Sequence, residues 1–179
     1  MQPVSYRIHP FTLLLLFFGL VYIIVTRHAT STLTQAALRQ PMPAIAVLDA
    51  SGTTISSDTM TGRPVIYVLW ASWCPPCRAE LPVLQALAPQ LSEAGIRLVL
   101  VNQGEDAQEV IPWLAARHIT MPAWFDAQSA FATALQAHDL PSMVFVNGDG
   151  NVDFIYRGPV THDIIKTMQS TWESQAGTR

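Results

Sequence analysis

Cys74 and Cys77 are the only two cysteines in the 179-residue sequence, and they stand two prolines apart between two predicted elements. Residues 65–70 form an unbroken apolar run, typical of a strand buried on both faces of a parallel sheet. Residues 75–94 then carry leucines at helical spacing and end before Gly95, the residue type preferred just past a helix. The sequence therefore predicts that Cys74 begins a helix directly after a buried strand.

The position of the two cysteines favours redox chemistry. Unpaired amides and the positive dipole end at a helix N-terminus stabilise a thiolate, so we expect Cys74 to be the attacking nucleophile. Cys77 lies one turn further and is expected to resolve the mixed disulfide that Cys74 forms. Pro75 and Pro76 suit a first helical turn, where amide donors are unpaired. A structural disulfide would usually join distant segments, and a zinc site would need two more ligands.

The remaining hydrophobic patterns predict an α/β fold. Short runs separated by Gly/Asn/Asp turns indicate strands, and apolar residues at helical spacing indicate helices. Helices are expected at residues 108–118, at 162–173 and from Asp126 through Gln136, and strands at 44–49, 53–56, 96–102, 143–147 and 152–157. Residues 122–125 are too short to assign. The order β, β, β, α, β, α, α, β, β, α places helices against a mixed central sheet.

An N-terminal run at residues 8–26 is apolar and carries no Asp, Glu, Lys or Arg. It falls within the roughly 17–25 residues that cross a bilayer as a helix. The alternative is a cleaved signal peptide, but those have apolar cores of about 7–15 residues, and Ala29-Thr30-Ser31 is a poor cleavage motif. We expect a membrane anchor with short flanks at 1–28, a linker at 29–43, a globular domain at 44–175 and a tail at 176–179. The formal net charge of −3 gives no support for nucleic-acid binding.

Residues 68–82, Val-Leu-Trp-Ala-Ser-Trp-Cys-Pro-Pro-Cys-Arg-Ala-Glu-Leu-Pro, resemble the active-site segment of the TlpA, ResA and CcmG group of anchored thioredoxin-like proteins. The similarity runs from about residue 43 to residue 172. The resemblance implies a thioredoxin-like fold, an extracytoplasmic location and dithiol chemistry. It implies no cofactor beyond the redox-active disulfide Cys74–Cys77.

The same resemblance assigns further site residues. Pro141 matches the cis-proline that faces the disulfide and offers backbone hydrogen bonds to a substrate. Glu80 matches the acidic residue three positions after the second cysteine, and it shares a helical face with Cys77. If it is partly buried, its pKa is raised and it can exchange protons with Cys77; the alternative is a solvated surface glutamate. Pro82 matches the proline that kinks the active-site helix. Apart from these three matches, we expect Trp73, Pro75 and Leu140 to contact the substrate, with Trp73 in an exposed apolar rim beside the motif.

Two departures from the wider pattern limit the assignment. Thioredoxins place a buried aspartate six residues before the first cysteine, where this sequence has Val68. CcmG-type proteins tend to carry a Gly-x-x-Gly-Ala-Pro-Glu-like loop at the cis-proline, where this sequence has Ala-His-Asp-Leu-Pro-Ser. The second departure puts a role in cytochrome c maturation in doubt. His138 in this loop is interpreted either as an exposed loop residue or as a group near the thiols.

Together these features predict a membrane-anchored extracytoplasmic enzyme that reduces disulfides of client proteins. Apocytochrome c or a metal-handling protein are candidate clients, and a DsbD-like or CcdA-like transporter is the expected electron donor. Oxidation of client thiols is the alternative direction. The direction depends on the reduction potential of the cysteine pair, and reduction potentials across this fold span about −270 to −120 mV. A copper-binding module using Cys74 and Cys77 as thiolate ligands and an anchored scaffold without activity are rival interpretations.

Overall fold

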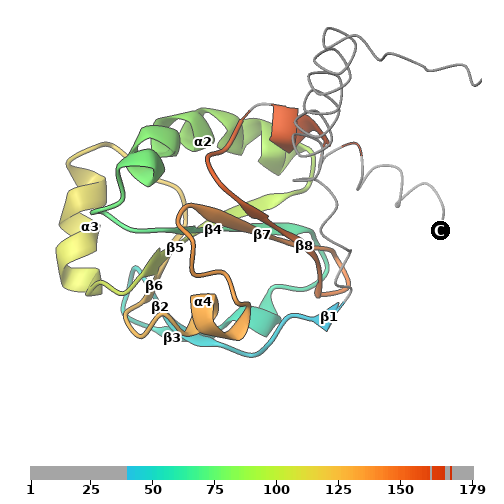
Figure 1. Ribbon diagram of the computed structural model, residues 1–179, viewed down its shortest axis with the longest axis horizontal. Coiled ribbons are helices and arrows are strands. Elements are labelled where there is room, and N and C mark those ends of the chain that lie inside the picture. The colour runs from blue at the N-terminus through green and yellow to red at the C-terminus, as the bar shows by residue number, and fades with distance from the viewer. Residues whose placement is uncertain (1–39, 162, 168–169, 171–179) are drawn as a thin grey trace, which may run out of the picture. The chain divides into compact units, whose positions relative to one another are not determined.

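The computed structural model describes residues 40–161, 163–167 and 170. Its helices are α2 (Pro75–Glu93), α3 (Ala107–Ala115) and α4 (Ala130–Ala134). Its strands are β1 (Gln40–Pro41), β2 (Ala46–Asp49), β3 (Thr54–Ser56), β4 (Val65–Trp70), β5 (Arg97–Gln103), β6 (Ala123–Asp126), β7 (Ser142–Val146) and β8 (Asn151–Arg157). The described residues build one mixed sheet in the order β1-β8-β7-β4-β5-β6-β2-β3 (Figure 1).

The centre of the sheet is parallel and its flanks are antiparallel. β5 pairs in parallel with both β4 and β6, while β7 lies antiparallel to β4 on the other side. Every residue of β4 is buried, because helices and loops cover both faces of this strand. The carboxyl end of β4 and the start of β7 therefore lie side by side, with Leu69 paired to Ser142.

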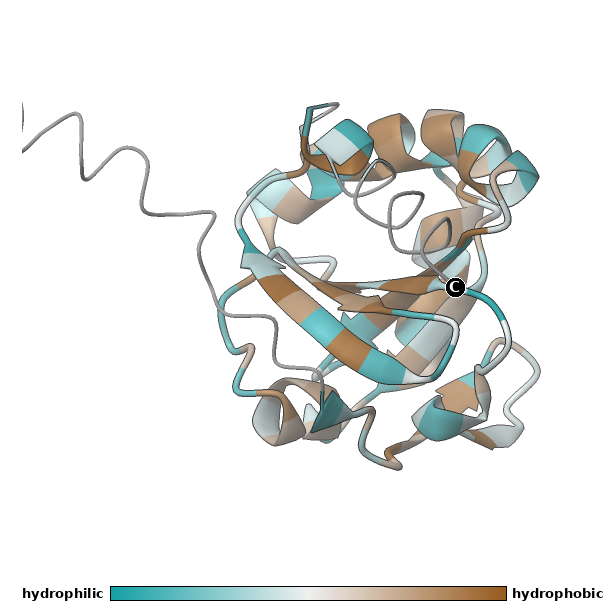
Figure 2. Ribbon diagram, turned by 90° about the vertical axis from the view of Figure 1, so that its right-hand side faces the viewer, coloured by the Kyte–Doolittle hydropathy of each residue, from teal (hydrophilic) through white to brown (hydrophobic). Residues whose placement is uncertain are grey.

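Two apolar clusters fill the two sides of the sheet. α2 and α3 cover one face and α4 the other (Figure 1). On β4 the side chains alternate between the clusters. Ile66, Val68 and Trp70 join the cluster beneath α2 and α3, and Tyr67 and Leu69 join the cluster on the α4 side. Figure 2 shows apolar stretches in the central strands and in the helix above the sheet, while polar and apolar residues alternate along the strand nearest the viewer.

Most of the predicted elements are confirmed, including the 44–56 hairpin, the strand before Cys74, the long helix after it and the 143–157 hairpin. Residues 163–167 and 170 are helical, and the rest of the expected 162–173 helix lies outside the described residues. Residues 122–125, left unassigned, contain most of β6, which pairs with β2 as well as β5.

Two elements differ from the prediction. Gln40 and Pro41, expected in the linker, pair with β8, and the neighbouring Met42 is 5% exposed. The helix expected from Asp126 to Gln136 is shortened to α4 because Asp126 belongs to β6. Its carboxylate nevertheless accepts hydrogen bonds from the amides of Ala130 and Phe131, at 2.9 and 2.7 Å. Asp126 thus supports the start of the helix from outside it.

The expected membrane anchor, residues 1–28, lies outside the described residues. Among the residues that are described, no helix is both long and apolar enough to span a bilayer.

Candidate active site

A disulfide joins Cys74 and Cys77 at the N-terminus of α2. Cys74 is the N-cap of the helix, and its Sγ accepts a hydrogen bond from the Cys77 amide at 3.3 Å. Pro75 and Pro76 occupy the first helical positions, where their missing amide hydrogens leave no helical bond unmade. The Cys77 amide is thus a fixed donor aimed at the sulfur that would carry negative charge in the reduced protein.

Both cysteines are buried, whereas neighbouring residues of the motif are exposed. Cys77 is fully buried and Cys74 is 3% exposed, whereas Trp73 between strand and helix is 65% exposed. Pro75 is also exposed. A large apolar ring therefore lies on the surface directly beside a recessed sulfur, where a protein partner can contact it. This placement fits the expected roles of Trp73 and Pro75 as substrate contacts, which remain predictions.

Glu80 is buried, which contradicts its alternative interpretation as a solvated surface residue. The residue is 4% exposed, and its Oε2 accepts a hydrogen bond from the Val160 amide at 2.9 Å. Oε1 has no hydrogen-bond partner among the described residues. Burial raises the pKa of Glu80 to about 7, against the opposing effect of the Val160 amide. The carboxyl group is therefore poised to gain or lose a proton near neutral pH, one helical turn from Cys77.

Val68 is fully buried in the cluster that contains both cysteines. The position that carries an acid in thioredoxins is thus an apolar core position here. Pro82 lies inside α2, as expected, and Pro89 is a second interior proline of the same helix.

The peptide bond between Leu140 and Pro141 is cis, as the resemblance predicted. Pro141 is buried directly before β7, at the sheet edge that also carries the end of β4 and the loop to Cys74. Leu140 is half-buried and packs against both apolar clusters. Its expected contact with substrate remains a prediction.

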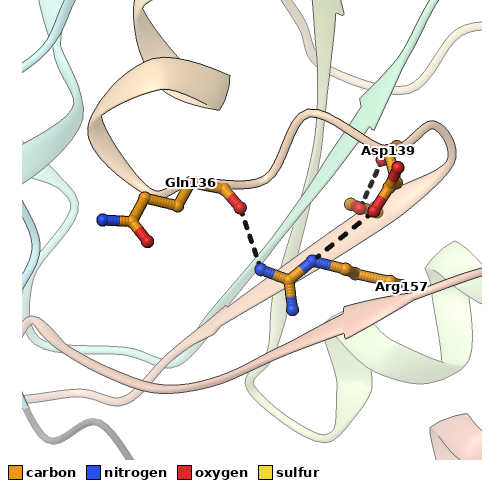
Figure 3. A network of polar contacts seen from close by, with 4 residues as sticks. Gln136, Asp139 and Arg157 are labelled. Atoms are coloured by element: carbon orange, nitrogen blue, oxygen red, sulfur yellow. Dashed lines mark hydrogen bonds and ion pairs between the residues drawn. The ribbon is translucent and has the colours of Figure 1, made fainter.

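The loop before Pro141 is tied to β8 by Arg157 (Figure 3). The Arg157 guanidinium donates to the Gln136 carbonyl at 2.9 Å, and its Nε lies 3.9 Å from a carboxylate oxygen of Asp139. The Ser142 hydroxyl donates to the Asp139 carbonyl at 2.5 Å. These contacts fix both ends of the turn that holds the cis bond.

Glu105 is a site residue that the sequence analysis did not single out. Its Oε2 accepts hydrogen bonds from the Ser72 amide and from Nδ2 of Asn102, both at 2.7 Å. Its Oε1 accepts a short hydrogen bond from the Ser72 hydroxyl. The carboxylate thus joins the loop before Cys74 to the end of β5. No local sequence motif marks this contact, because Ser72 and Glu105 are 33 residues apart.

The other candidates lie apart from this chemistry or pack the core. His138 is exposed, in agreement with its interpretation as a loop residue. Trp70 is buried and its ring centroid lies 5.4 Å from that of Trp113, while Trp124 is buried against Tyr67. Within the described part of the chain no group of three or more His, Cys, Asp or Glu residues is arranged to hold a metal ion.

A mixed sheet, a Cys-x-x-Cys disulfide at the start of the helix after β4 and a cis-proline directly before the neighbouring strand β7 define a thioredoxin-like thiol-disulfide oxidoreductase. The Redoxin family model matches residues 37–171, and the chain belongs to this family.

Individual relatives agree with this class. The chain is 32% identical over 150 residues to the thiol:disulfide interchange protein DsbE of Escherichia coli K12, covering 80% of this chain and 78% of that protein. It is 29% identical over 154 residues to the thiol-disulfide oxidoreductase ResA of Geobacillus thermodenitrificans, covering 86% and 88%. The crystal structure of StoA from Bacillus subtilis matches with a TM-score of 0.60 and 26% identity, over 70% of this chain and 95% of that one.

Proposed function

We propose that this protein is anchored in the cytoplasmic membrane and reduces disulfides of client proteins on the extracytoplasmic side. The Cys74 thiolate attacks one sulfur of the client disulfide, and the other client sulfur leaves as a thiolate. The Cys77 thiolate then attacks Cys74 in the mixed disulfide, which releases the client as a dithiol and leaves Cys74–Cys77 oxidised. Two electrons from a membrane donor must restore the dithiol in each cycle.

The observation that carries this proposal is the asymmetry of the pair at the start of α2. Cys74 lies at the helix N-terminus beside exposed Trp73, while Cys77 is fully buried. An incoming client disulfide can therefore approach only the first sulfur. The second sulfur can react only with its neighbour, so Cys77 is the group that resolves the mixed disulfide.

In the proposed reduction Glu80 is the proton acceptor for Cys77. Cys77 must lose a proton before it can resolve the mixed disulfide, and a buried thiol has a raised pKa. A carboxyl group with a pKa of about 7 on the same helical face is matched to that transfer. Since Val68 occupies the position of the usual buried acid, Glu80 takes this role alone in the proposed mechanism.

Relatedness to DsbE and ResA favours apocytochrome c as a client and a DsbD-like or CcdA-like electron donor, and residues 8–26 would hold the domain at the membrane. The loop before Pro141 departs from the CcmG-type pattern, so a metal-handling protein is a second candidate client.

The proposal is tested by trapping clients with a Cys77→Ser variant of the full-length protein. This variant attacks through Cys74 but cannot resolve, so mixed disulfides should accumulate and separate on non-reducing gels. Cys74→Ser and the double Cys74→Ser/Cys77→Ser variant are matched controls and should trap nothing. The trapped clients should be more oxidised in cells that lack the protein. Clients that become more reduced in those cells would establish the oxidising direction instead.

A further inference from the structure

The Glu105 carboxylate uses both of its oxygens to hold the loop that leads to Cys74. Two N–H donors, the Ser72 amide and Nδ2 of Asn102, meet on Oε2 at 2.7 Å each. The Ser72 hydroxyl donates to Oε1. Hydrogen bonds to an ionised acceptor are about twice as strong as neutral ones, so three on one carboxylate form a firm connection.

The backbone that carries Glu105 is itself fixed on both sides. Gly104 has a φ of 74°, which a residue with a side chain rarely adopts, and its amide donates to the Asp126 carbonyl at 2.9 Å. On the other side Asp106 caps α3 by accepting from the Gln108 amide at 2.9 Å. Glu105 therefore lies in a well-fixed turn between β5 and α3, and its hydrogen bonds restrain the position of Ser72.

The turn that Glu105 holds, residues 71–74, has buried ends and an exposed middle: Ala71 is fully buried and Cys74 is 3% exposed, and both belong to the apolar cluster beneath α2 and α3. The Cys74 amide donates to the Ala71 carbonyl at 3.2 Å, which closes a single turn. Trp73 inside that turn is 65% exposed, so packing contributes little to its position. Between the two buried ends, Ser72 is the residue that links the turn to β5, through the carboxylate of Glu105.

We propose that Glu105 is a positioning residue for thiol-disulfide exchange: it holds the 71–74 turn so that the Cys74 sulfur stays at the N-terminus of α2, aligned for attack. Glu105 acts through Ser72 and does not touch the reacting sulfurs. The inference concerns the attack itself and requires no particular client.

The test uses the reduced full-length protein and 5,5′-dithiobis(2-nitrobenzoate) as the disulfide probe. Cys74 attacks the probe and releases one aromatic thiolate, and Cys77 then displaces the second, so the protein becomes oxidised and the probe is reduced. Glu105→Ala should slow the first release about tenfold, since small displacements of reacting groups have effects of this size and larger. Glu105→Gln should stay within about threefold of the parent, because its amide oxygen can accept both N–H bonds and its NH2 group can donate to the Ser72 hydroxyl. Glu109→Ala, which removes an exposed acid from α3, is the matched control and should react like the parent.

Rescue by glutamine separates positioning from other roles. A Glu105→Ala protein that melts at a lower temperature but reacts with the probe at the parent rate would assign Glu105 a structural role only and overturn the proposal. Equal impairment of Glu105→Gln and Glu105→Ala would also overturn it, because the charge and not the hydrogen bonds would then be responsible. If Glu105→Ala does not fold, Ser72→Ala removes one of the three bonds from the other side. It should slow the first release about twofold to threefold, and a parent rate in that variant would contradict the proposal.

Discussion

Replacement of Glu80 by glutamine should remove a pH dependence of stability that the buried carboxyl group imposes. In the folded protein burial raises the pKa of Glu80 to about 7 from an ordinary value of 4.5. Between these two pH values the folded protein keeps a proton that the unfolded chain has released. The free energy of unfolding of the parent therefore falls as pH rises through this window and levels off above pH 7.

The size of the effect follows from the difference between the two pKa values. Each tenfold change in proton affinity is worth about 1.4 kcal/mol, so the full loss approaches about 3 kcal/mol. Between pH 5 and pH 8 the parent should lose about 2–3 kcal/mol relative to the variant by the same linkage. Glutamine cannot ionise, and its amide oxygen can still accept from the Val160 amide. Any cost of the buried amide is the same at both pH values and cancels in this comparison.

The assay is denaturant unfolding of the oxidised protein at several pH values. In the oxidised form Cys74 and Cys77 are bonded to each other and do not titrate, so the difference between parent and variant reports Glu80. Glu93→Gln is the matched control, because Glu93 is exposed at the end of the same helix. The Glu93 variant should run parallel to the parent at all pH values.

If the free energies of unfolding of Glu80→Gln and the parent changed in parallel from pH 5 to pH 8, the raised pKa of Glu80 would be refuted. The same variant tests the proposed chemistry in the reduced protein. If Glu80 accepts the Cys77 proton, Glu80→Gln should slow disulfide exchange about tenfold, which corresponds to about 1.4 kcal/mol at the barrier. A parent exchange rate together with a changed pH dependence of stability would leave Glu80 buried but without a catalytic role.

Three further predictions concern the cysteines, the tryptophans and the membrane. In the reduced protein Cys74 should titrate below the ~8.5 of a free thiol and alkylate faster than Cys77; equal alkylation rates would argue against the assignment of the nucleophile. Trp73→Ala should weaken client capture and leave the melting temperature nearly unchanged because Trp73 is exposed, whereas Trp70→Ala in the core should lower the free energy of unfolding by about 3–5 kcal/mol. Thermal melts measure the stabilities, and trapping in the Cys77→Ser background measures capture. Normal capture by the Trp73 variant would show that Trp73 does not contact the client. Fractionation should find the full-length chain in the membrane, and an alkaline phosphatase fusion at its C-terminus should be active; a soluble mature protein would show that residues 8–26 are not a retained anchor.

The parts of the site that local sequence determines were predictable. Residues 65–70 could be assigned to a buried strand because every side chain in the run is apolar, and the helix after Cys74 followed from the leucine spacing and Gly95. The cis bond before Pro141 was predictable only through the family resemblance, since an X-Pro bond in a folded protein is trans in about 95% of cases.

The parts that depend on distant contacts were not predictable. The environment of Glu80 is formed by a segment 80 residues away, where the Val160 amide donates a hydrogen bond to its carboxylate. No local pattern around Glu80 shows this contact. The connection between Glu105 and Ser72 likewise joins two loops that approach only after β4 and β5 pair. Residues 123–126 are too few to show the alternation of apolar and polar side chains that marks a strand. They form a strand because they pair with β2 and β5.

The recessed position of Cys74 sets a geometric condition on the clients. Because Cys74 is 3% exposed beside a Trp73 that is 65% exposed, its sulfur cannot meet a disulfide that lies flush with a folded, rigid surface. The client disulfide must be carried on a protruding or unfolded segment that can bend past Trp73 to reach it. The protein should therefore distinguish among disulfides by the state of folding of the chain around them, and a client should escape further reduction once it has folded over its cysteines.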